Sequence, residues 1–231
     1  MKQHALLYAC LPCDETFACA VRRGEWTGSE NDWRSSVNTA QELDWVRLAQ
    51  KGDWIAFGRL VEAYQGPVFN LCYRMLGNPE EAADAAQETF VRIYSKLHTY
   101  QPDRKLASWI LSIASHYCID RLRRHHGEML SLDDEPIAAV LSAHQIGPEE
   151  SVMQNETRDE VQRAVNRLEP SYRIPLILRY WYNLSYAEIA DVMGLTVQAV
   201  KSRLHRARQQ MVEVTASTGI ARGAIAPMSV R

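Results

Sequence analysis

Hydrophobic residues recur every three to four positions over most of this chain, which predicts α-helices. The period persists from about Thr39 onward, and no run alternates hydrophobic and polar residues as a half-buried strand would. The clearest case begins after Asn78, where five apolar residues share one helix face: Ala83, Ala86, Phe90, Ile93 and Leu97. We therefore expect an all-α fold.

Capping residues, glycines and prolines set the helix boundaries in the first half of the chain. We expect four helices, over about residues 40–50, 54–76, 79–97 and 105–125. Asp53 and Asn78 can cap the second and third, and Pro79 suits a first helical turn. Pro67 is expected to kink or break the second helix.

A second helical unit is expected from about Glu156. Pro170 ends its first helix, whose apolar stripe consists of Val161, Val165 and Leu168. Ser171 can cap the next helix, which tolerates Pro175 in its opening turn and runs to about Trp181.

The segment 184–208 carries the strongest local signal. Ser185 and Glu188 form a capping box, in which each side chain satisfies the other's backbone N–H. Gly194 supplies a left-handed residue that ends this helix, and Thr196 can cap the next one. A short turn with a glycine between two helices predicts a helix-turn-helix.

The last helix has an apolar face and a basic face. The apolar residues are Val197, Val200 and Leu204. The polar residues, with two flanking arginines at the end, are Gln198, Lys201, Ser202, His205, Arg206, Arg203 and Arg208. Such side chains can read base edges and neutralise phosphates. A merely solvated helix is the alternative, but its four cations, with no acid among them, would repel one another. We expect DNA binding.

Composition is that of a soluble protein, with 46% hydrophobic and 23% charged residues. No apolar run is long enough for a membrane span, and the stretch Ala5–Cys10 is too short for a signal peptide, so we expect a cytoplasmic protein without membrane insertion.

The net charge of −2 is unevenly distributed. Residues 41–130 carry 11 basic and 11 acidic side chains, and residues 156–211 carry nine basic and six acidic ones. Between them, residues 131–155 carry five acids and no Lys or Arg, which is typical of a linker. We expect two small helical domains, 41–130 and 156–212, joined by a flexible acidic linker at 131–155. A poorly ordered extension, 1–40, precedes them, and a flexible tail, 213–231, follows.

Five cysteines raise the question of a metal site. Cys72 and Cys118 fall within amphipathic helices, where buried free thiols are expected. Cys10, Cys13 and Cys19 cluster near His4 and could start a zinc or redox site, but the second half of a zinc signature is missing. We expect reduced, unliganded thiols, with no metal and no cofactor.

Two helices of the first domain carry unusual polar faces. Asp84 and Glu88 are stacked four residues apart beside Gln87; this acidic face suits a basic partner or, equally, plain solvent. The fourth helix presents, on one face, Trp109, Ser112, His116, Asp120, Arg123 and Arg124. Aromatic and basic groups together suit unpaired bases, although Trp109 could instead belong to the core. No partner ligand or nucleophile makes His116 a metal ligand or a general base.

Three strings in this order resemble the extracytoplasmic-function sigma factors of the sigma-70 superfamily. They are residues 84–90 (DAAQETF), 108–124 (with SWILSIA and IDRLRR), and 184–208 (with LSYAEIA and VKSRLHRAR). The resemblance covers about residues 44–211, and the last string is the most specific.

The resemblance implies a role for each string. Asp84, Gln87 and Glu88 would bind the clamp of core RNA polymerase. The minus-ten element would be bound, and its melted state stabilised, by Trp109, His116, Asp120, Arg121, Arg123 and Arg124. Lys201, Ser202, His205 and Arg206, with Gln198 beside them, would contact minus-thirty-five bases, and Arg203 and Arg208 would contact phosphates. The linker would enter the polymerase cleft, and the implied partners are core polymerase (clamp and flap), promoter DNA and an anti-sigma factor.

Departures from the family pattern occur at three positions. His116 replaces a common Asn, Ser112 a common basic residue and Ala85 a usual Leu. The alternative function is a self-sufficient helix-turn-helix regulator, but the balanced charge of the first domain offers little affinity for phosphates. We expect no enzymatic activity, because no spaced acidic cluster or activated nucleophile is present.

Overall fold

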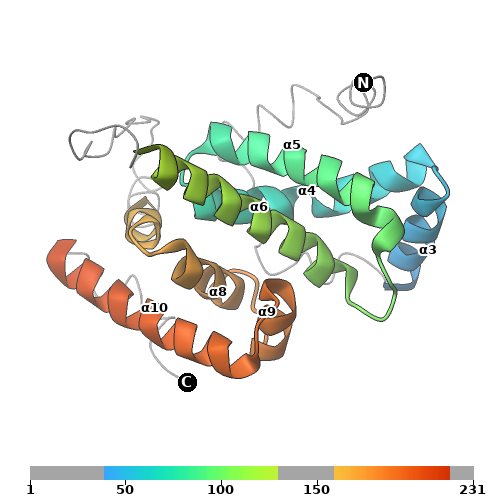
Figure 1. Cartoon of the computed structure of the whole chain (residues 1–231). Helices are drawn as coiled ribbons and strands as arrows, with labels where there is room; N and C mark the ends of the chain where they lie inside the picture. The colour runs from blue at the N-terminus through green and yellow to red at the C-terminus, as the bar shows by residue number, and fades with distance from the viewer. Residues whose placement is uncertain (1–38, 130–158, 219–231) are drawn as a thin grey trace, which may run out of the picture.

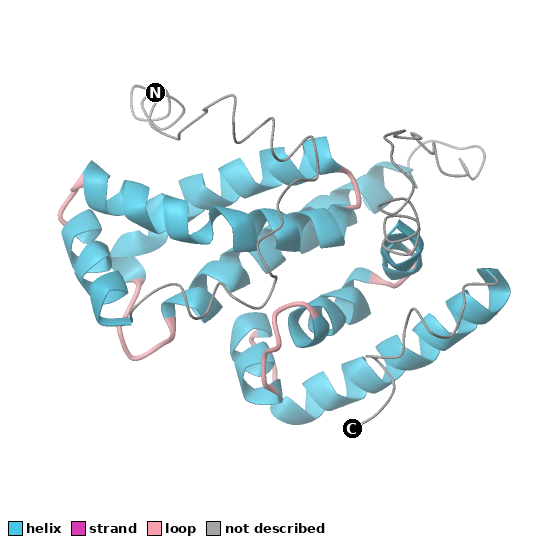
Figure 2. Ribbon diagram, turned by 180° about the vertical axis from the view of Figure 1, so that it is seen from behind, coloured by secondary structure: helices cyan, strands magenta, loops and turns pink. Residues whose placement is uncertain are grey.

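The computed structural model describes residues 39–129 and 159–218, and every regular element within these two ranges is helical (Figures 1 and 2). The predicted all-α class is confirmed. The expected acidic linker and nearly all of the expected N-terminal extension lie outside the described residues. We call residues 39–129 the first unit and residues 159–218 the second unit.

The first unit consists of α3 (Thr39–Gln50), α4 (Trp54–Leu76), α5 (Pro79–Lys96), the short 3₁₀ helix η2 (Leu97–Thr99) and α6 (Leu106–Met129). The second consists of a helical segment at residues 159–166, α8 (Pro170–Tyr180), α9 (Tyr186–Met193) and α10 (Val197–Thr218).

The predicted caps of α4 and α5 are present. The Asp53 carboxylate accepts hydrogen bonds from the backbone N–H groups of Ile55 (2.9 Å) and Ala56 (3.1 Å). Asn78 caps α5 in the same way, with its side-chain oxygen 2.8 Å from the backbone nitrogen of Glu80. Each contact satisfies a helix N-terminal donor that has no partner within the helix.

Pro67 lies inside α4, so the expected break is absent. Tyr64 and Val68 are both buried beside it. Burying a large apolar side chain stabilises the fold by about 1.5–3 kcal/mol. This stabilisation outweighs the loss of one backbone hydrogen bond at Pro67.

Helix α4 is the centre of the first unit, and α3, α5 and α6 pack against it (Figure 1). Its residues Val68, Leu71 and Met75 are completely buried. Ala82 and Ala85 on α5 are also completely buried, and such small side chains let two helices approach closely.

The second unit differs from the prediction at the start of α8 and at the end of α10. Glu169, not Ser171, is the residue before α8, because Pro170 has the backbone geometry of a first helical residue. The Ser171 hydroxyl donates to the Glu169 carboxylate instead (2.8 Å). Helix α10 continues to Thr218, past the expected start of the tail at residue 213, because Met211 is buried and Val214 packs against the core.

The two units pack against each other. Helices α8 and α9 lie against α4 and α6, while α10 forms the outer edge of the molecule on the side away from α5 (Figure 1). Buried residues of both units form one continuous hydrophobic cluster. The first unit therefore positions the helix-turn-helix.

Candidate nucleic-acid interface

The predicted helix-turn-helix is present in α9, α10 and the turn between them. The backbone N–H of Ser185 donates to the Glu188 carboxylate (2.8 Å), and the Glu188 N–H donates to the Ser185 hydroxyl (3.3 Å), which completes the capping box. Gly194 has a φ of 63° and ends α9 in the left-handed conformation. The Thr196 hydroxyl then accepts from the N–H of Ala199 (3.2 Å) and caps α10.

Helix α10 separates its apolar and polar side chains as expected, with one exception. Val200 and Leu204 are buried, together with Ala207 and Met211. Val197, assigned to the same face, is 40% exposed and is the first residue of α10. The apolar face therefore begins one turn later than expected.

The polar residues of α10 face solvent. Five of them are exposed: Gln198, Lys201, Ser202, His205 and Arg206. Arg203 and Arg208 flank this face and are half-buried. None of the four cations pairs with a carboxylate among the described residues, whereas Arg206 donates to the hydroxyl of Tyr172 on α8 (3.3 Å). Unpaired cations on one exposed face form a site for a polyanion.

The polar face of α6 is the second surface. Trp109 is half-buried, with its ring centroid 5.2 Å from that of Tyr100, so it belongs partly to the core and partly to the surface. The Ser112 hydroxyl donates to the backbone oxygen of Trp109 (2.7 Å), and the Nδ1 of His116 lies 2.6 Å from the backbone oxygen of Ser112. Exposed residues follow: His116, Asp120, Arg123 and Arg124.

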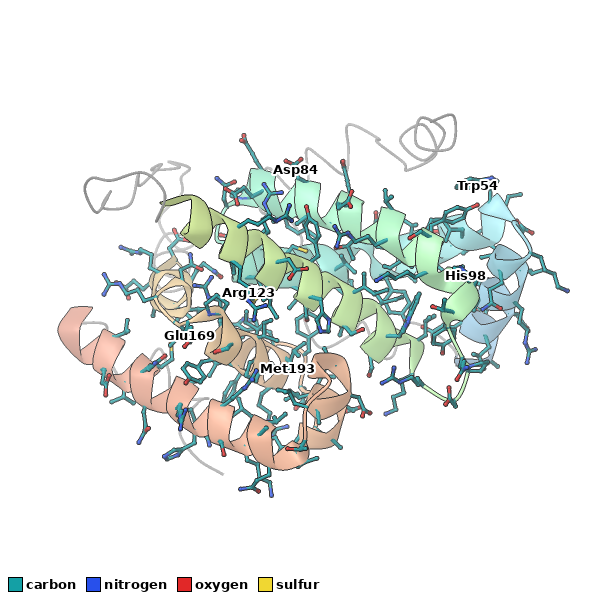
Figure 3. The ribbon with its side chains drawn as sticks, viewed as in Figure 1. Trp54, Asp84, His98, Arg123, Glu169 and Met193 are labelled. Atoms are coloured by element: carbon teal, nitrogen blue, oxygen red, sulfur yellow. The ribbon has the colours of Figure 1, made fainter. Side chains whose placement is uncertain are left out.

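Arg121 lies on another side of α6. Its Nε is 3.7 Å from the carboxylate of Glu81 on α5, and its side chain is only 24% exposed. In contrast, Arg123 lies between α6 and α8 in the view of Figure 3 and is exposed. The structure thus separates Arg121 from the other residues assigned to minus-ten DNA.

The acidic face of α5 points away from the second unit, as the position of Asp84 shows (Figure 3). Asp84 and Gln87 are exposed. Glu88 is half-buried and accepts from the Nε of Arg92 (3.0 Å), and the Arg92 guanidinium lies 4.5 Å from the ring centroid of Tyr117 on α6. Glu88 is therefore paired within α5, whereas Asp84 and Gln87 are exposed.

The family model of sigma-70 region 2 matches residues 60–128, and that of sigma-70 region 4 matches residues 158–211. The extracytoplasmic-function (ECF) RNA polymerase sigma factor SigW of Bacillus subtilis is 33% identical over 172 residues, which cover 72% of this chain and 92% of SigW. The chain belongs to the ECF sigma factors.

Other members of the family are similarly related to this sigma factor. The sigma-H factor of Pseudomonas aeruginosa is 31% identical over 73% of this chain and 91% of its own length. Two solved structures share the fold: CnrH in complex with the cytosolic domain of CnrY (24% identity, TM-score 0.54, 77% of this chain and 98% of that chain), and RpoE of Bartonella quintana with the anti-sigma factor NepR (20%, 0.53, 69% and 96%).

The candidate metal residues of this sigma factor, His4, Cys10, Cys13 and Cys19, lie outside the described residues. Within the described ranges, no group of three or more His, Cys, Asp or Glu side chains could hold a metal ion. Cys72 and Cys118 are buried free thiols, as predicted. A hydrogen bond with Cys118, together with burial, raises the pKa of the Cys72 thiol well above its ordinary value. None of the described helices is long and apolar enough to cross a membrane.

Sequence reasoning missed the polar residues that join the two sigma regions. Arg173 of α8 is buried and donates to the backbone oxygens of Met75, Asn166 and Leu168, the last at 2.9 Å. Burial lowers its pKa to about 10, so the guanidinium is still charged at neutral pH. Gln162 is buried beside it. Spacing within a helix gives no signal for the contacts across the two regions, because the acceptors there, the backbone oxygens of Met75 and Arg74, are 98 and 88 residues away.

Proposed function

We propose that this sigma factor binds core RNA polymerase through α5, reads the minus-ten element with α6 and reads the minus-thirty-five element with α10. It would thereby direct promoter-specific initiation. The observation that carries the proposal is the exposed, uncompensated basic face of α10 directly after a helix-turn-helix turn. Family membership favours this function over a self-sufficient regulator.

On α10, the exposure of each side chain indicates whether it would contact bases or phosphates. Lys201, Ser202 and Arg206 are exposed and lie one and four residues apart on α10. All three side chains could therefore reach base edges if α10 lies in the major groove. Tyr172 holds the Arg206 guanidinium through its hydroxyl, so the arginine is partly oriented before DNA arrives. The half-buried Arg203 and Arg208 would contact phosphates at the rim of the groove.

On α6, the hydrogen bond of His116 determines which of its ring nitrogens can accept a hydrogen bond from a base. The Ser112 backbone oxygen can only accept, so the neutral ring carries its proton on Nδ1. Nε2 then faces solvent as an acceptor and would bind an exocyclic amino group. Arg123 and Arg124 would follow the backbone of the melted strand, whereas Arg121 would fix α6 to α5 through Glu81.

On α5, Asp84 and Gln87 would contact a basic surface of the polymerase clamp, because both are exposed on the face turned away from α10. Core polymerase would perform the chemistry, and the sigma factor would act by binding alone in the cytoplasm. The similar structures of CnrH and RpoE are complexes with CnrY and with the anti-sigma factor NepR, which supports an anti-sigma partner for this chain.

The test is run-off transcription with purified core polymerase on a library of randomised promoters, followed by sequencing of the products. Addition of this chain is expected to produce starts that share a minus-thirty-five and a minus-ten element. Starts that do not depend on the chain would refute the proposal, and tight binding to a DNA site without polymerase would support the alternative regulator.

A further inference from the structure

Two cysteines lie in contact at the centre of the first unit. Cys72 is on α4 and Cys118 is on α6, and both are completely buried free thiols. The two thiols are hydrogen-bonded to each other. Because α4 and α6 pack directly against each other, this contact joins two helices that are distant in the chain.

The two thiols belong to a series of hydrogen bonds across three helices. The hydroxyl of the buried Thr89 on α5 donates to the backbone oxygen of Ala85 (2.7 Å). Since that bond uses the only proton of the hydroxyl, the thiol is the donor in the hydrogen bond between Cys72 and Thr89. The Cys118 thiol in turn donates to the Cys72 sulfur. The two sulfur atoms therefore face each other.

The packing of α4 against α6 suits a covalent bond between these sulfur atoms. A disulfide needs Cα atoms within about 7 Å and side chains that point toward each other. Ala114 lies one turn before Cys118 on the same face of α6 and is completely buried, and so small a side chain lets two helices approach closely. A disulfide would remove both S–H donors, but Thr89 would keep its bond to Ala85. No buried hydroxyl would lose its last partner.

The same surroundings make the thiols unreactive once the protein has folded. The hydrogen bond with Cys118 and burial together raise the pKa of the Cys72 thiol well above its ordinary value. The thiolate, which is the form that attacks an oxidant, is therefore scarce at neutral pH. An oxidant also reaches neither sulfur without a local opening of the helices, because both residues are completely buried. Oxidation is therefore expected while the chain folds.

We propose that Cys72 and Cys118 are a disulfide-forming pair, which a small-molecule disulfide oxidises during folding and which the packed helices then protect from further exchange. One cysteine thiolate attacks the small disulfide and releases one of its thiolates. The second cysteine attacks the protein sulfur of the mixed disulfide, so that the Cys72–Cys118 bond forms and the second small thiolate leaves. The two departing thiolates take up the two cysteine protons, and two electrons pass from the protein to the oxidant.

The bond fastens α6 to the central helix α4 and acts on stability. It constrains the unfolded chain between the two cysteines, which favours the folded state. The exposed residues Asp84, His116 and Arg123 are not changed by a bond between buried atoms. The inference does not rest on the function proposed above, because it concerns bond formation and unfolding alone.

The test is refolding of the full chain from urea in a buffer of reduced and oxidised glutathione. The protein carries Cys10→Ser, Cys13→Ser and Cys19→Ser, so that Cys72 and Cys118 are its only cysteines. After free thiols are blocked with N-ethylmaleimide, the intact mass gives the number of labels, and peptide mapping without reductant identifies linked peptides. We expect an unlabelled monomer in which the peptides of Cys72 and Cys118 are linked. Two labels, or a glutathione on each cysteine, overturn the proposal.

The matched control is Cys118→Ser combined with Ser115→Cys, which moves the thiol by about one turn along α6 to another buried position. The effective concentration of the two thiols, taken from the glutathione concentrations at half oxidation, should be at least about tenfold higher in the parent than in the control. Equal values overturn the proposal. Circular dichroism of both reduced proteins shows whether the control folds.

Two further measurements need no control variant. The parent, once folded in its reduced form, should react with oxidised glutathione at least about tenfold more slowly than it does during refolding, because the folded thiols are buried. The cross-linked protein should unfold at a urea concentration about 1 M higher than the reduced protein. Equal oxidation rates overturn the protection by packing, and an unchanged or lower midpoint overturns the fit of the bond to the fold.

Discussion

Substitution of Arg173 by Met should destabilise the protein by about 3 kcal/mol. The change removes a buried guanidinium and leaves three backbone oxygens, those of Met75, Asn166 and Leu168, without this donor. Each buried acceptor left unsatisfied costs about 1–3 kcal/mol, and the apolar methionine recovers part of that by packing. Arg173→Lys should lose about half as much, because one ammonium keeps the charge but cannot span all three oxygens.

The assay is urea unfolding at neutral pH followed by circular dichroism, since the described residues are largely helical. Arg163→Met is the matched control: the side chain is exposed, so its replacement should change the free energy of unfolding by no more than about 0.5 kcal/mol. A loss below about 1 kcal/mol for Arg173→Met would refute the reasoning that this cation satisfies the ends of two helices.

Three further predictions address separate parts of the molecule. Arg206→Ala should cost about 1–3 kcal/mol in promoter discrimination and relax the minus-thirty-five preference of run-off products; an unchanged preference would remove Arg206 from base reading. Asp84→Arg should weaken capture of core polymerase in a pull-down without loss of helix content, while Glu62→Arg, the same charge change on α4, should not; equal capture by both variants would contradict the role of α5. Gly194→Ala should lower the free energy of unfolding by about 1–2 kcal/mol, because a φ of 63° is unfavourable for alanine. A clash does not contribute, since no atom lies within 4 Å of the added Cβ. The same substitution at the helical Gly58, where space is also open, should raise stability by about 0.5–1 kcal/mol, and an equal loss at both sites would contradict the assignment of the cost at Gly194 to its positive φ.

Local chemistry made much of the fold predictable. Asp53, Asn78 and the Ser185–Glu188 box act on backbone groups two or three residues away, so their effect is visible in the sequence. Gly194 is equally local, since the left-handed conformation depends on the residue itself. The exposed polar residues of α10 followed from the same helical period that buried Val200 and Leu204.

Features that depend on distant partners could not be predicted. Arg121 has the positive charge expected of a DNA contact, but it pairs with Glu81 on the neighbouring helix α5. Arg173 and Gln162 each donate to a backbone oxygen of α4 in the other unit, and such an acceptor carries no sequence signal.

The most direct test of the central claim is a footprint on one promoter from the run-off library, with core polymerase alone, this chain alone, and both together. Protection over the minus-thirty-five and minus-ten elements should appear only with both proteins, and the Arg206→Ala chain should lose the upstream part. Equal protection by the chain alone would contradict the account and identify an independent DNA-binding regulator.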